Sequence, residues 1–223
     1  FFWVLGTVVA LAVVALILAG SGFSRLWKYG DKGGRDSTWA VIVALLVLIP
    51  FLVSGYRIAV LPFLSDISTD LSDPPQLLRA AARRTPAMNE IGTITPEAAE
   101  QQRRNYPEVT GRRYDMPADR VREAIDTVVA GYGWPVIDPG QTNAPDESSA
   151  PEITMELTAC TFWLCFPVDV AIRITDEGET SYVDVRSAAR YARHDFGDNA
   201  RRITGFFEDL DTEIASKVAP TEQ

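Results

Sequence analysis

The spacing of hydrophobic and polar positions divides the chain into an apolar N-terminal part and a mixed remainder. Phe1 to Gly20 contains no charged side chain, and a second apolar run extends from about Trp39 to Tyr56. A helix of about 20 apolar residues crosses a ~30 Å hydrocarbon core. Trp39 and Tyr56 stand at the ends of the second run, where aromatic rings favour the membrane–water interface. The pattern predicts a two-helix transmembrane hairpin over residues 1–61, with buried helices of a soluble protein as the alternative.

The segment between the two apolar runs, residues 21–38, is basic. It holds two arginines and two lysines against two aspartates: Arg25, Lys28, Lys32 and Arg35 against Asp31 and Asp36. Short basic loops stay on the cytoplasmic side of a membrane. We therefore expect a bacterial inner-membrane protein with a cytoplasmic loop at 21–38, and with the residues after about 57 in the periplasm.

Residues 62–108 are rich in proline and polar side chains and show little periodicity. The run Asp73-Pro74-Pro75 is incompatible with a helix interior. Pro96 to Asn105 has helix-forming composition, with proline at the first turn, where it is tolerated. We predict an extended strap or linker over 62–108 that leaves the membrane, wraps the following domain and contains one short helix.

From Val109 onward the pattern becomes regular and predicts a folded domain over 109–219. The chain has helical spacing of apolar residues in two segments, and three longer segments alternate between apolar and polar residues. The predicted helices are Pro117–Gly131 and Asp198–Val218, and the predicted strands are Glu152–Trp163, Val168–Thr175 and Thr180–Ala188. Shorter strands are expected at TGRRYDM and at Trp134–Ile137.

The alternation gives the predicted sheet two different faces. In the second long strand the valines and isoleucines share one face, while Asp169 and Arg173 share the other. In the third, Asp184 and Arg186 oppose the valines, so cross-strand charge pairs are expected. The predicted fold is α+β: two transmembrane helices, then a two-layer domain of antiparallel sheet with two helices on its apolar face.

Charge excludes one class of partner. Residues 65–223 hold 16 Lys+Arg and 28 Asp+Glu, a net of −12. Sequence-independent DNA binding needs a basic footprint, so we expect no nucleic-acid partner. An acidic domain is also repelled by anionic headgroups, except at local basic spots.

The stretch YVDVRSAARYARHDFGDNARRI, residues 182–203, concentrates the polar candidates. Asp195 or Asp198 can cap the last helix, and Gly197 can supply a positive φ. One interpretation is a structural clasp in which arginines bond internal carboxylates and carbonyls. The other is a site for a phosphate, a carboxylate or a lipid headgroup at a helix N-terminus. The residues in question are Arg186, Ser187, Arg190, Arg193, His194, Asp195 and Asn199.

Recognised catalytic and metal-binding motifs are missing from the sequence. His194 is the only histidine, so a zinc site would need unusual ligands. We expect a hydrogen-bonding role for His194, and we predict no catalytic residue, no metal and no cofactor. Whether the chain is an enzyme stays open, with a non-enzyme the favoured interpretation.

The only two cysteines, Cys160 and Cys165, flank TFWL and fall in the part predicted to be exported. In an oxidising compartment they can form a disulfide, and two buried thiols are the alternative. Phe162, Trp163 and Phe166 cluster at the same tip. We expect these rings to pack in the core, with an exposed tip that docks on a protein or a membrane as the alternative.

Three blocks resemble the domain of unknown function 1499 family: SDISTDLSDPPQL (65–77), TFWLCFPVDVAIRI (161–174) and VDVRSAARYARHDFGDNARRI (183–203). The resemblance covers most of residues 65–214. It implies a membrane-associated or exported domain, and it implies no catalytic residues. The chain departs from the family pattern at Val168, which replaces the first of two paired acids, at Ala189, which replaces a serine, and at Ala192, which replaces a glycine.

These observations favour a membrane-anchored periplasmic accessory protein, a non-catalytic subunit or assembly partner of a larger membrane complex. Its expected partners are the lipid bilayer and other membrane-protein subunits. The alternative function is a membrane-tethered domain that binds a phospholipid or small anion at the Arg186–Arg190 block. An apolar cavity beside those arginines would favour the alternative, whereas arginines engaged by internal acids would favour the accessory role.

Overall fold

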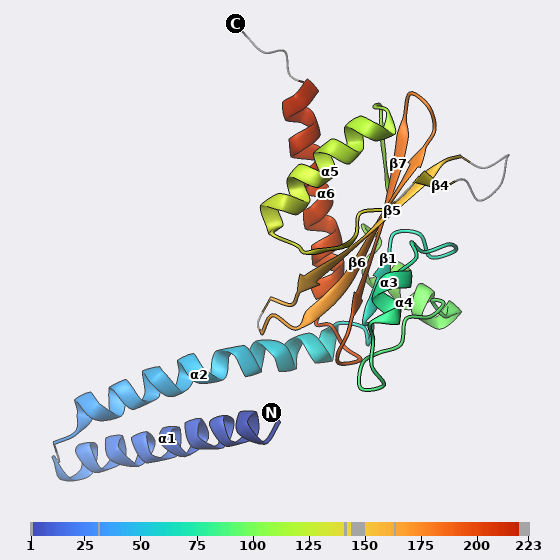
Figure 1. Cartoon of the computed structure of the whole chain (residues 1–223). Helices are drawn as coiled ribbons and strands as arrows, with labels where there is room; N and C mark the ends of the chain where they lie inside the picture. The colour runs from blue at the N-terminus through green and yellow to red at the C-terminus, as the bar shows by residue number, and fades with distance from the viewer. Residues whose placement is uncertain (1, 31, 141, 144–149, 163, 219–223) are drawn as a thin grey trace, which may run out of the picture. The chain divides into compact units, whose positions relative to one another are not determined.

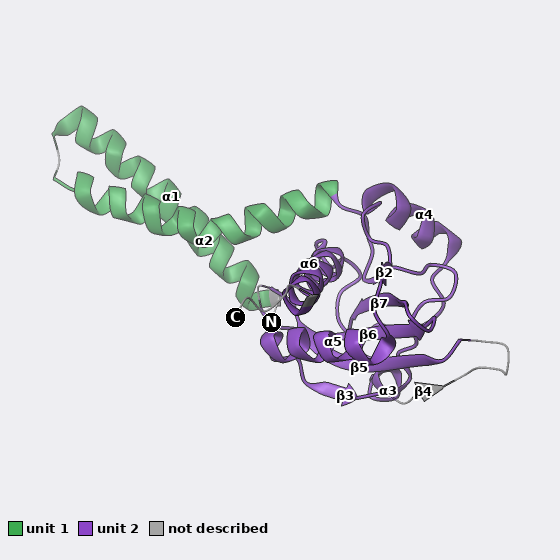
Figure 2. Cartoon of the chain, turned by 90° about the horizontal axis from the view of Figure 1, so that it is seen from above, with its two compact units in different colours: residues 1–60 green, residues 61–223 purple. Residues whose placement is uncertain are grey.

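The computed structural model describes residues 2–30, 32–140, 142–143, 150–162 and 164–218. The chain forms two compact units, residues 1–60 and 61–223, which Figure 2 distinguishes by colour. The first unit is a pair of helices, and the second contains the whole sheet.

The first unit consists of α1 (Phe2–Tyr29) and α2 (Gly34–Val60). Both helices are long and apolar enough to cross a membrane. Small side chains are buried where the two helices meet, at Ala12, Ala19 and Ala44, because small residues let helix backbones approach closely in a bilayer. Large apolar side chains such as Leu46 point outward. Two helices of this kind indicate a membrane anchor.

The predicted loop at 21–38 is wrong in extent. α1 continues to Tyr29 and α2 begins at Gly34, so most of that segment is helical. Arginine and lysine end an apolar run but are good helix formers, so the helices continue beyond the expected spans. α1 ends where Gly30 adopts a φ of +70°, a conformation that terminates helices and suits glycine.

The second unit is built on one antiparallel sheet in the order β1-β7-β6-β5-β3. β2 shares an edge of β7 with β1, and β4 shares an edge of β5 with β3. The strands are β1 (Asp66–Ser68), β2 (Arg112–Tyr114), β3 (Val136–Asp138), β4 (Thr142–Asn143), β5 (Glu152–Cys160), β6 (Pro167–Asp176) and β7 (Ser181–Ala189). The three long strands lie within a few residues of their predicted positions.

α5 (Ala118–Tyr132) and α6 (Asp198–Val218) lie together against one face of the sheet (Figure 1). α5 ends at Gly133 with a φ of +65°, a left-handed C-cap. α6 buries its apolar stripe, including Ile203, Phe206 and Leu210, against β-strand side chains such as Val170. The predicted fold class, an α+β domain of antiparallel sheet packed with helices, is confirmed.

The other face of the sheet is covered by residues 66–111, which run from β1 to the start of β2 and which we call the covering segment. β1 pairs with the C-terminal half of β7, and α3 (Leu78–Ala82) follows it. Leu77 and Ala80 pack on Ala171 and Ala188 in a small second core. α4 (Pro96–Asn105) begins at a Thr95 cap and fastens to β1 through Gln102, whose side chain bonds both the N–H and the carbonyl of Ser68. Charged residues on this face are therefore enclosed by the chain itself.

Candidate functional site

Arg186 lies on β7 and points into the covered face, with 2% of its surface exposed. Its Nε and Nη2 donate to the two oxygens of Asp66 at 3.0 and 2.7 Å. Nη2 also donates to the carbonyl of Gly92 at 2.7 Å, and Nη1 to that of Pro75 at 3.4 Å. All three guanidinium nitrogens therefore have acceptors within the domain.

Arg190 shares a carboxylate with an arginine from the covering segment. Its Nε and Nη2 donate to Oδ1 of Asp169 at 3.0 and 2.7 Å. Arg84 donates from its Nε and Nη2 to Oδ2 of the same residue, at 3.0 and 2.7 Å. Asp169 is completely buried. Burying a carboxylate is costly unless it is paired and hydrogen-bonded, so the two arginines offset the desolvation of Asp169.

Arg84 also fastens the covering segment to the end of β7. It donates to the carbonyls of Asn89, Ala188 and Ala189. The Asn89 amide donates to the carbonyls of Ala189 and Ala192 at 3.0 and 2.7 Å. These bonds satisfy backbone groups where the strand ends.

Arg173 and Asp184 form the cross-strand pair expected from the alternation, since they stand opposite each other on β6 and β7. Arg173 Nη2 lies 3.1 Å from Asp184 Oδ2. The covering segment adds two more carboxylates, Asp70 at 3.1 Å and Asp73 at 2.7 Å. The two terminal nitrogens of the guanidinium are thus bonded by acceptors that the chain itself supplies, whereas its Nε is buried without a hydrogen-bond partner among the described residues.

Ser187 and Asn199 belong to a separate network between β7 and α6. Ser187 Oγ donates to Asn199 Oδ1 at 2.9 Å, and Asn199 Nδ2 donates to the Ser65 carbonyl at 2.9 Å. Arg202 donates to Asn199 Oδ1 at 2.8 Å and to the Cys160 carbonyl at 2.9 Å. Burial lowers the pKa of the Arg202 guanidinium. This network joins the strand end, the helix start and the cysteine loop.

The carboxylate that caps α6 is that of Asp195. It accepts from the N–H groups of Gly197 and Asn199, both at 2.9 Å. Burial raises the pKa of Asp195, and these backbone hydrogen bonds oppose that rise. Gly197 has a φ of +75°, the left-handed conformation anticipated for it.

His194 acts through its ring nitrogens in the same loop. Nδ1 accepts from the Phe196 N–H at 2.9 Å, and Nε2 lies 3.3 Å from the Leu61 carbonyl. An accepting Nδ1 leaves the proton of a neutral ring on Nε2, where it donates to that carbonyl. Arg193, the preceding residue, is exposed.

The predicted site residues therefore do not converge on one point. Arg186 and Arg190, with the predicted charge-pair residues, lie on the covered face of the sheet. Ser187 and Asn199 lie on the α6 side, and Asp195 and His194 form the loop between them.

Sequence reasoning missed six residues of these networks. Asp66, Asp70 and Asp73 accept from Arg186 and Arg173, while Arg84, Asn89 and Arg202 donate to Asp169, to backbone carbonyls and to Asn199. No signal in the single sequence could have found them, because the strands themselves show no shortage of acids. β6 and β7 hold two arginines, Arg173 and Arg186, and three aspartates, Asp169, Asp176 and Asp184.

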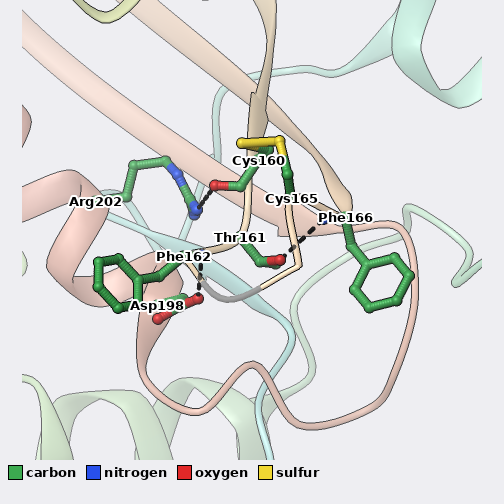
Figure 3. Close-up of a disulfide and its surroundings, with 7 residues drawn as sticks. All are labelled: Cys160, Thr161, Phe162, Cys165, Phe166, Asp198 and Arg202. Carbon is green, nitrogen blue, oxygen red and sulfur yellow. Dashed lines mark hydrogen bonds between the residues drawn. A yellow bond between two sulfur atoms is a disulfide. The ribbon is translucent and has the colours of Figure 1, made fainter.

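The cysteines lie at the turn between β5 and β6 and form a disulfide, drawn in Figure 3. The expectation that the neighbouring rings pack in the core is wrong for Phe162, which is 78% exposed, and for Phe166, which is 39% exposed. The loop that the disulfide closes has six residues, which is too short to fold both aromatic side chains back under the sheet. Trp163 lies outside the described residues.

The described part of the chain contains no group of three or more His, Cys, Asp or Glu side chains placed to hold a metal ion. Two surface hollows in the described part of the chain include neither Arg186 nor Arg190. One lies between α5 and α6 near Tyr132, and the other lies between α4 and β7 near Asp184. The second hollow is lined in part by Arg103 of α4, which is exposed and pairs with Glu100 at 3.4 Å. Neither hollow presents Arg186 or Arg190 beside an apolar cavity.

The model of a protein family described as "Protein of unknown function (DUF1499)" matches residues 66–210. The chain belongs to this family. The matched region runs from the start of β1 to Leu210 in α6, so it includes the covering segment, the whole sheet and both networks.

Two solved structures show weak similarity to this DUF1499 chain. CalU16 from Micromonospora echinospora has 15% sequence identity over 49% of this chain and 74% of that protein, with a TM-score of 0.31. TTHA0849 from Thermus thermophilus has 11% identity over 49% and 97%, with a TM-score of 0.25. Likeness at this level carries no argument about function. No curated protein matches the chain significantly.

The geometry gives a physical meaning to one departure from the DUF1499 pattern. Ala192 stands where the resemblance has glycine, and its φ is +64°. A side chain at positive φ is strained, so glycine is the favoured residue for this backbone conformation. Phe196, with a φ of +56°, carries similar strain in the same loop.

Proposed function

We propose that this DUF1499 chain is a membrane-anchored accessory protein, a non-catalytic subunit or assembly partner of a larger membrane complex. One observation carries the proposal: the donors of Arg186 and Arg190 are engaged by Asp66, Asp169 and backbone carbonyls inside the domain. In this role the arginine block is a device that fixes the fold.

An anion site at the same block would have to displace those internal acceptors. Asp66 is half-buried and Asp169 is fully buried, and leaving such a buried acceptor without a partner costs about 1–3 kcal/mol, or more for a carboxylate. The DUF1499 domain also carries a net charge of −12 beyond residue 64, which opposes the approach of an anion. Both terms favour the accessory role over the lipid- or anion-binding alternative.

The proposed location is the bacterial inner membrane, with the domain in the periplasm and residues 21–38 on the cytoplasmic side. The basic residues of that segment support this orientation. The Cys160–Cys165 disulfide hints at an extracytoplasmic domain, because disulfides persist in oxidising compartments.

The test is gentle extraction of the full chain from its native membrane, followed by size determination and mass spectrometry. We expect protein companions in stoichiometric amounts. A chain that travels alone with a bound phospholipid or metabolite would contradict the accessory role and support the alternative.

The helix pair is expected to carry most of the partner affinity. A matched variant replaces α1 and α2 with an unrelated two-span hairpin and leaves residues 61–223 unchanged. Loss of the companions from this variant is the expected result. Retention of the same companions by the chain from residue 65 onward would contradict that assignment.

A further inference from the structure

We propose that one end of the domain is a lipid-contacting surface that places aromatic side chains in the interface of the bilayer that anchors the same chain. We name this surface the entry rim and define it as residues 61–64, 160–162, 164–167 and 190–197. The inference rests on membrane anchoring by α1 and α2, and it is independent of the accessory role.

Three segments distant in sequence are held together at the rim. The Asp195 N–H donates to the Leu64 carbonyl at 3.0 Å, which ties the first residues of the domain to the loop after β7. The rings of Phe63 and His194 lie 4.8 Å apart. The Phe162 N–H donates to Asp198 at 3.2 Å, which ties the cysteine loop to the start of α6.

Large apolar side chains project from all three segments. The exposed fractions are 66% for Phe63, 78% for Phe162, 55% for Leu164, 39% for Phe166 and 40% for Tyr191. The Phe166 and Tyr191 rings lie 6.1 Å apart, so the cysteine loop and the loop after β7 present a shared aromatic surface. Clustered exposure of this kind marks an interaction surface.

The cysteine loop is built to hold its rings outward. The disulfide closes it, and the Thr161 hydroxyl accepts from the Phe166 N–H at 3.0 Å. Arg202 holds the Cys160 carbonyl from α6 at 2.9 Å. Figure 3 shows the Phe162 and Phe166 rings on opposite sides of this loop. The exposed rings therefore stand on a fixed support.

Charge distinguishes the rim from the rest of the domain. Although residues 65–223 carry a net of −12, the rim segments contain one acid, Asp195. That carboxylate is 5% exposed and caps α6. Arg193 is exposed at the same end. A surface of aromatic rings with an arginine and no exposed carboxylate suits the headgroup layer, where amphipathic side chains concentrate.

Connectivity places this surface beside the bilayer. Leu61, the first residue of the domain, is part of the rim and directly follows Val60, the last residue of α2. The apolar run ends at Tyr56, so four residues, about 6 Å of helix, separate the end of that run from Val60. The headgroup layer is itself about 5–8 Å thick on each side. A bilayer is therefore the occupant that the chain necessarily brings within reach, whereas a partner protein is not.

The experiment uses the full chain in phosphatidylethanolamine–phosphatidylglycerol vesicles, with a spin label on one introduced cysteine. Cys160 and Cys165 are joined to each other, so the label reacts with the new thiol. Tyr191→Cys reports on the rim. Glu179→Cys, in the exposed turn between β6 and β7, is the control, about 30 Å away at the other end of a ten-residue strand. Leu46→Cys in α2 reports on anchoring.

The collision rate of the spin label with oxygen, which concentrates in the bilayer, is compared with its collision rate with a water-soluble nickel chelate. We expect the ratio of the oxygen rate to the nickel rate to be several-fold higher at Tyr191→Cys than at Glu179→Cys. Adding Phe162→Ser with Phe166→Ser is expected to lower the ratio, while Leu78→Ser, which removes an exposed leucine from α3, is expected to leave it unchanged.

Three results would overturn the proposal. A Tyr191→Cys label as accessible to nickel as the control shows a rim in water. A label shielded from both reagents shows a protein contact, either a second copy or a partner. A nickel-accessible Leu46→Cys label refutes the anchoring on which the inference rests, and this result is separate from any finding about companions.

Discussion

Arg186 of β7 and Asp66 of β1 form a two-bond ion pair across neighbouring antiparallel strands, with N–O distances of 3.0 and 2.7 Å. The pair joins residues 120 positions apart. It fixes the covering segment to the sheet at the point where β1 contributes only three residues of strand. So short a strand has few backbone bonds of its own, and we expect the charge pair to help fix its register.

Replacing Arg186 by alanine is therefore expected to destabilise the domain by about 3–5 kcal/mol, because it leaves Asp66 and two carbonyls without their donor. Asp66→Asn is expected to cost less, since the amide oxygen still accepts one bond. Urea unfolding of the full chain in detergent, followed by near-ultraviolet circular dichroism, measures both. Arg186→Lys keeps the charge but loses the two-bond geometry and is expected to fall between them. A loss under about 0.5 kcal/mol in Arg186→Ala would refute the clasp, because changes that small are ordinary for surface substitutions.

Asp169 is expected to be the more sensitive position, because its carboxylate serves both Arg84 and Arg190. Asp169→Asn leaves two enclosed guanidinium groups facing a neutral amide, so its cost is expected to exceed that of Arg84→Ala. The control is Asp126→Asn, which removes an exposed pair with Arg122 on α5 and is expected to change stability by less than about 1 kcal/mol. The same unfolding measurement ranks the three variants. Equal effects at Asp169 and Asp126 would contradict the shared-carboxylate arrangement.

Alternation and helical spacing were enough to place the three long strands and the helices α5 and α6, because each of these elements buries a continuous apolar face. The covering segment has no such period. The covering segment contributes Asp66, Asp70 and Asp73 to the buried ion pairs, and each of them pairs with an arginine about 100 or more positions later. One sequence read alone cannot pair residues at that separation.

The candidate site could be predicted as a set of residues and not as an arrangement. The stretch from Arg186 to Asn199 is polar and dense, yet successive side chains on β7 point to opposite faces of the sheet. Arg186 and Ser187 are neighbours in sequence and belong to different networks. The exposure of Phe162 could not be predicted either, since an apolar side chain at a turn is compatible both with a core position and with a surface position.

Tyr106 is expected to make stability fall in strong alkali. Burial, assisted by the negative charge of Asp195, raises the pKa of Tyr106 to about 12. A raised phenol pKa means that the folded state retains its proton longer, so the contribution is present below about pH 10 and is lost as pH rises toward 12. Unfolding free energies measured between about pH 8 and 12 are expected to decline over that window, and Tyr106→Phe is expected to decline less.

At about pH 8 the same variant is expected to be at least as stable as the parent. The Tyr106 hydroxyl is buried and makes no hydrogen bond with any residue that the structure describes, so its removal relieves an unsatisfied group. Tyr114→Phe is the matched control. Its hydroxyl donates to Asp211 at 2.8 Å, and its loss is expected to cost about 1 kcal/mol. A larger loss in Tyr106→Phe than in Tyr114→Phe would contradict this account.

Two glycines near the start of α6 are expected to respond oppositely to alanine. Gly197 has a φ of +75°, and an added Cβ would lie 3.0 Å from Leu61 Cδ1. Gly197→Ala is expected to destabilise by about 1–2 kcal/mol. Gly205 lies inside the helix with nothing within 4 Å of an added Cβ, so Gly205→Ala is expected to stabilise by about 0.5–1 kcal/mol. Thermal melts of the two variants beside the parent decide the signs, and a shared sign would refute the conformational argument.

The disulfide is expected to contribute modestly to stability. Closing a six-residue loop restricts the unfolded chain by about 2 kcal/mol at most in the entropy model. The loop also keeps bonds that do not depend on sulfur, including Cys165 N–H to the Thr161 carbonyl at 3.1 Å and Arg202 to the Cys160 carbonyl at 2.9 Å. The double variant Cys160→Ser with Cys165→Ser is therefore expected to fold and to lose about 2 kcal/mol or less.

Urea unfolding of the parent with and without dithiothreitol gives an independent measure, and the reduced parent is expected to match the double serine variant. Arg202→Ala separates the two supports of the loop, because it removes the anchor from α6 and leaves the disulfide intact. Arg202→Ala is expected to lower the free energy of unfolding more in the double serine variant than in the parent. In the parent the disulfide still holds the loop when the Arg202 hydrogen bond is lost, so the two effects are not additive. Unfolding on reduction alone would show instead that the disulfide, and not the network around Arg202, holds this end of the domain.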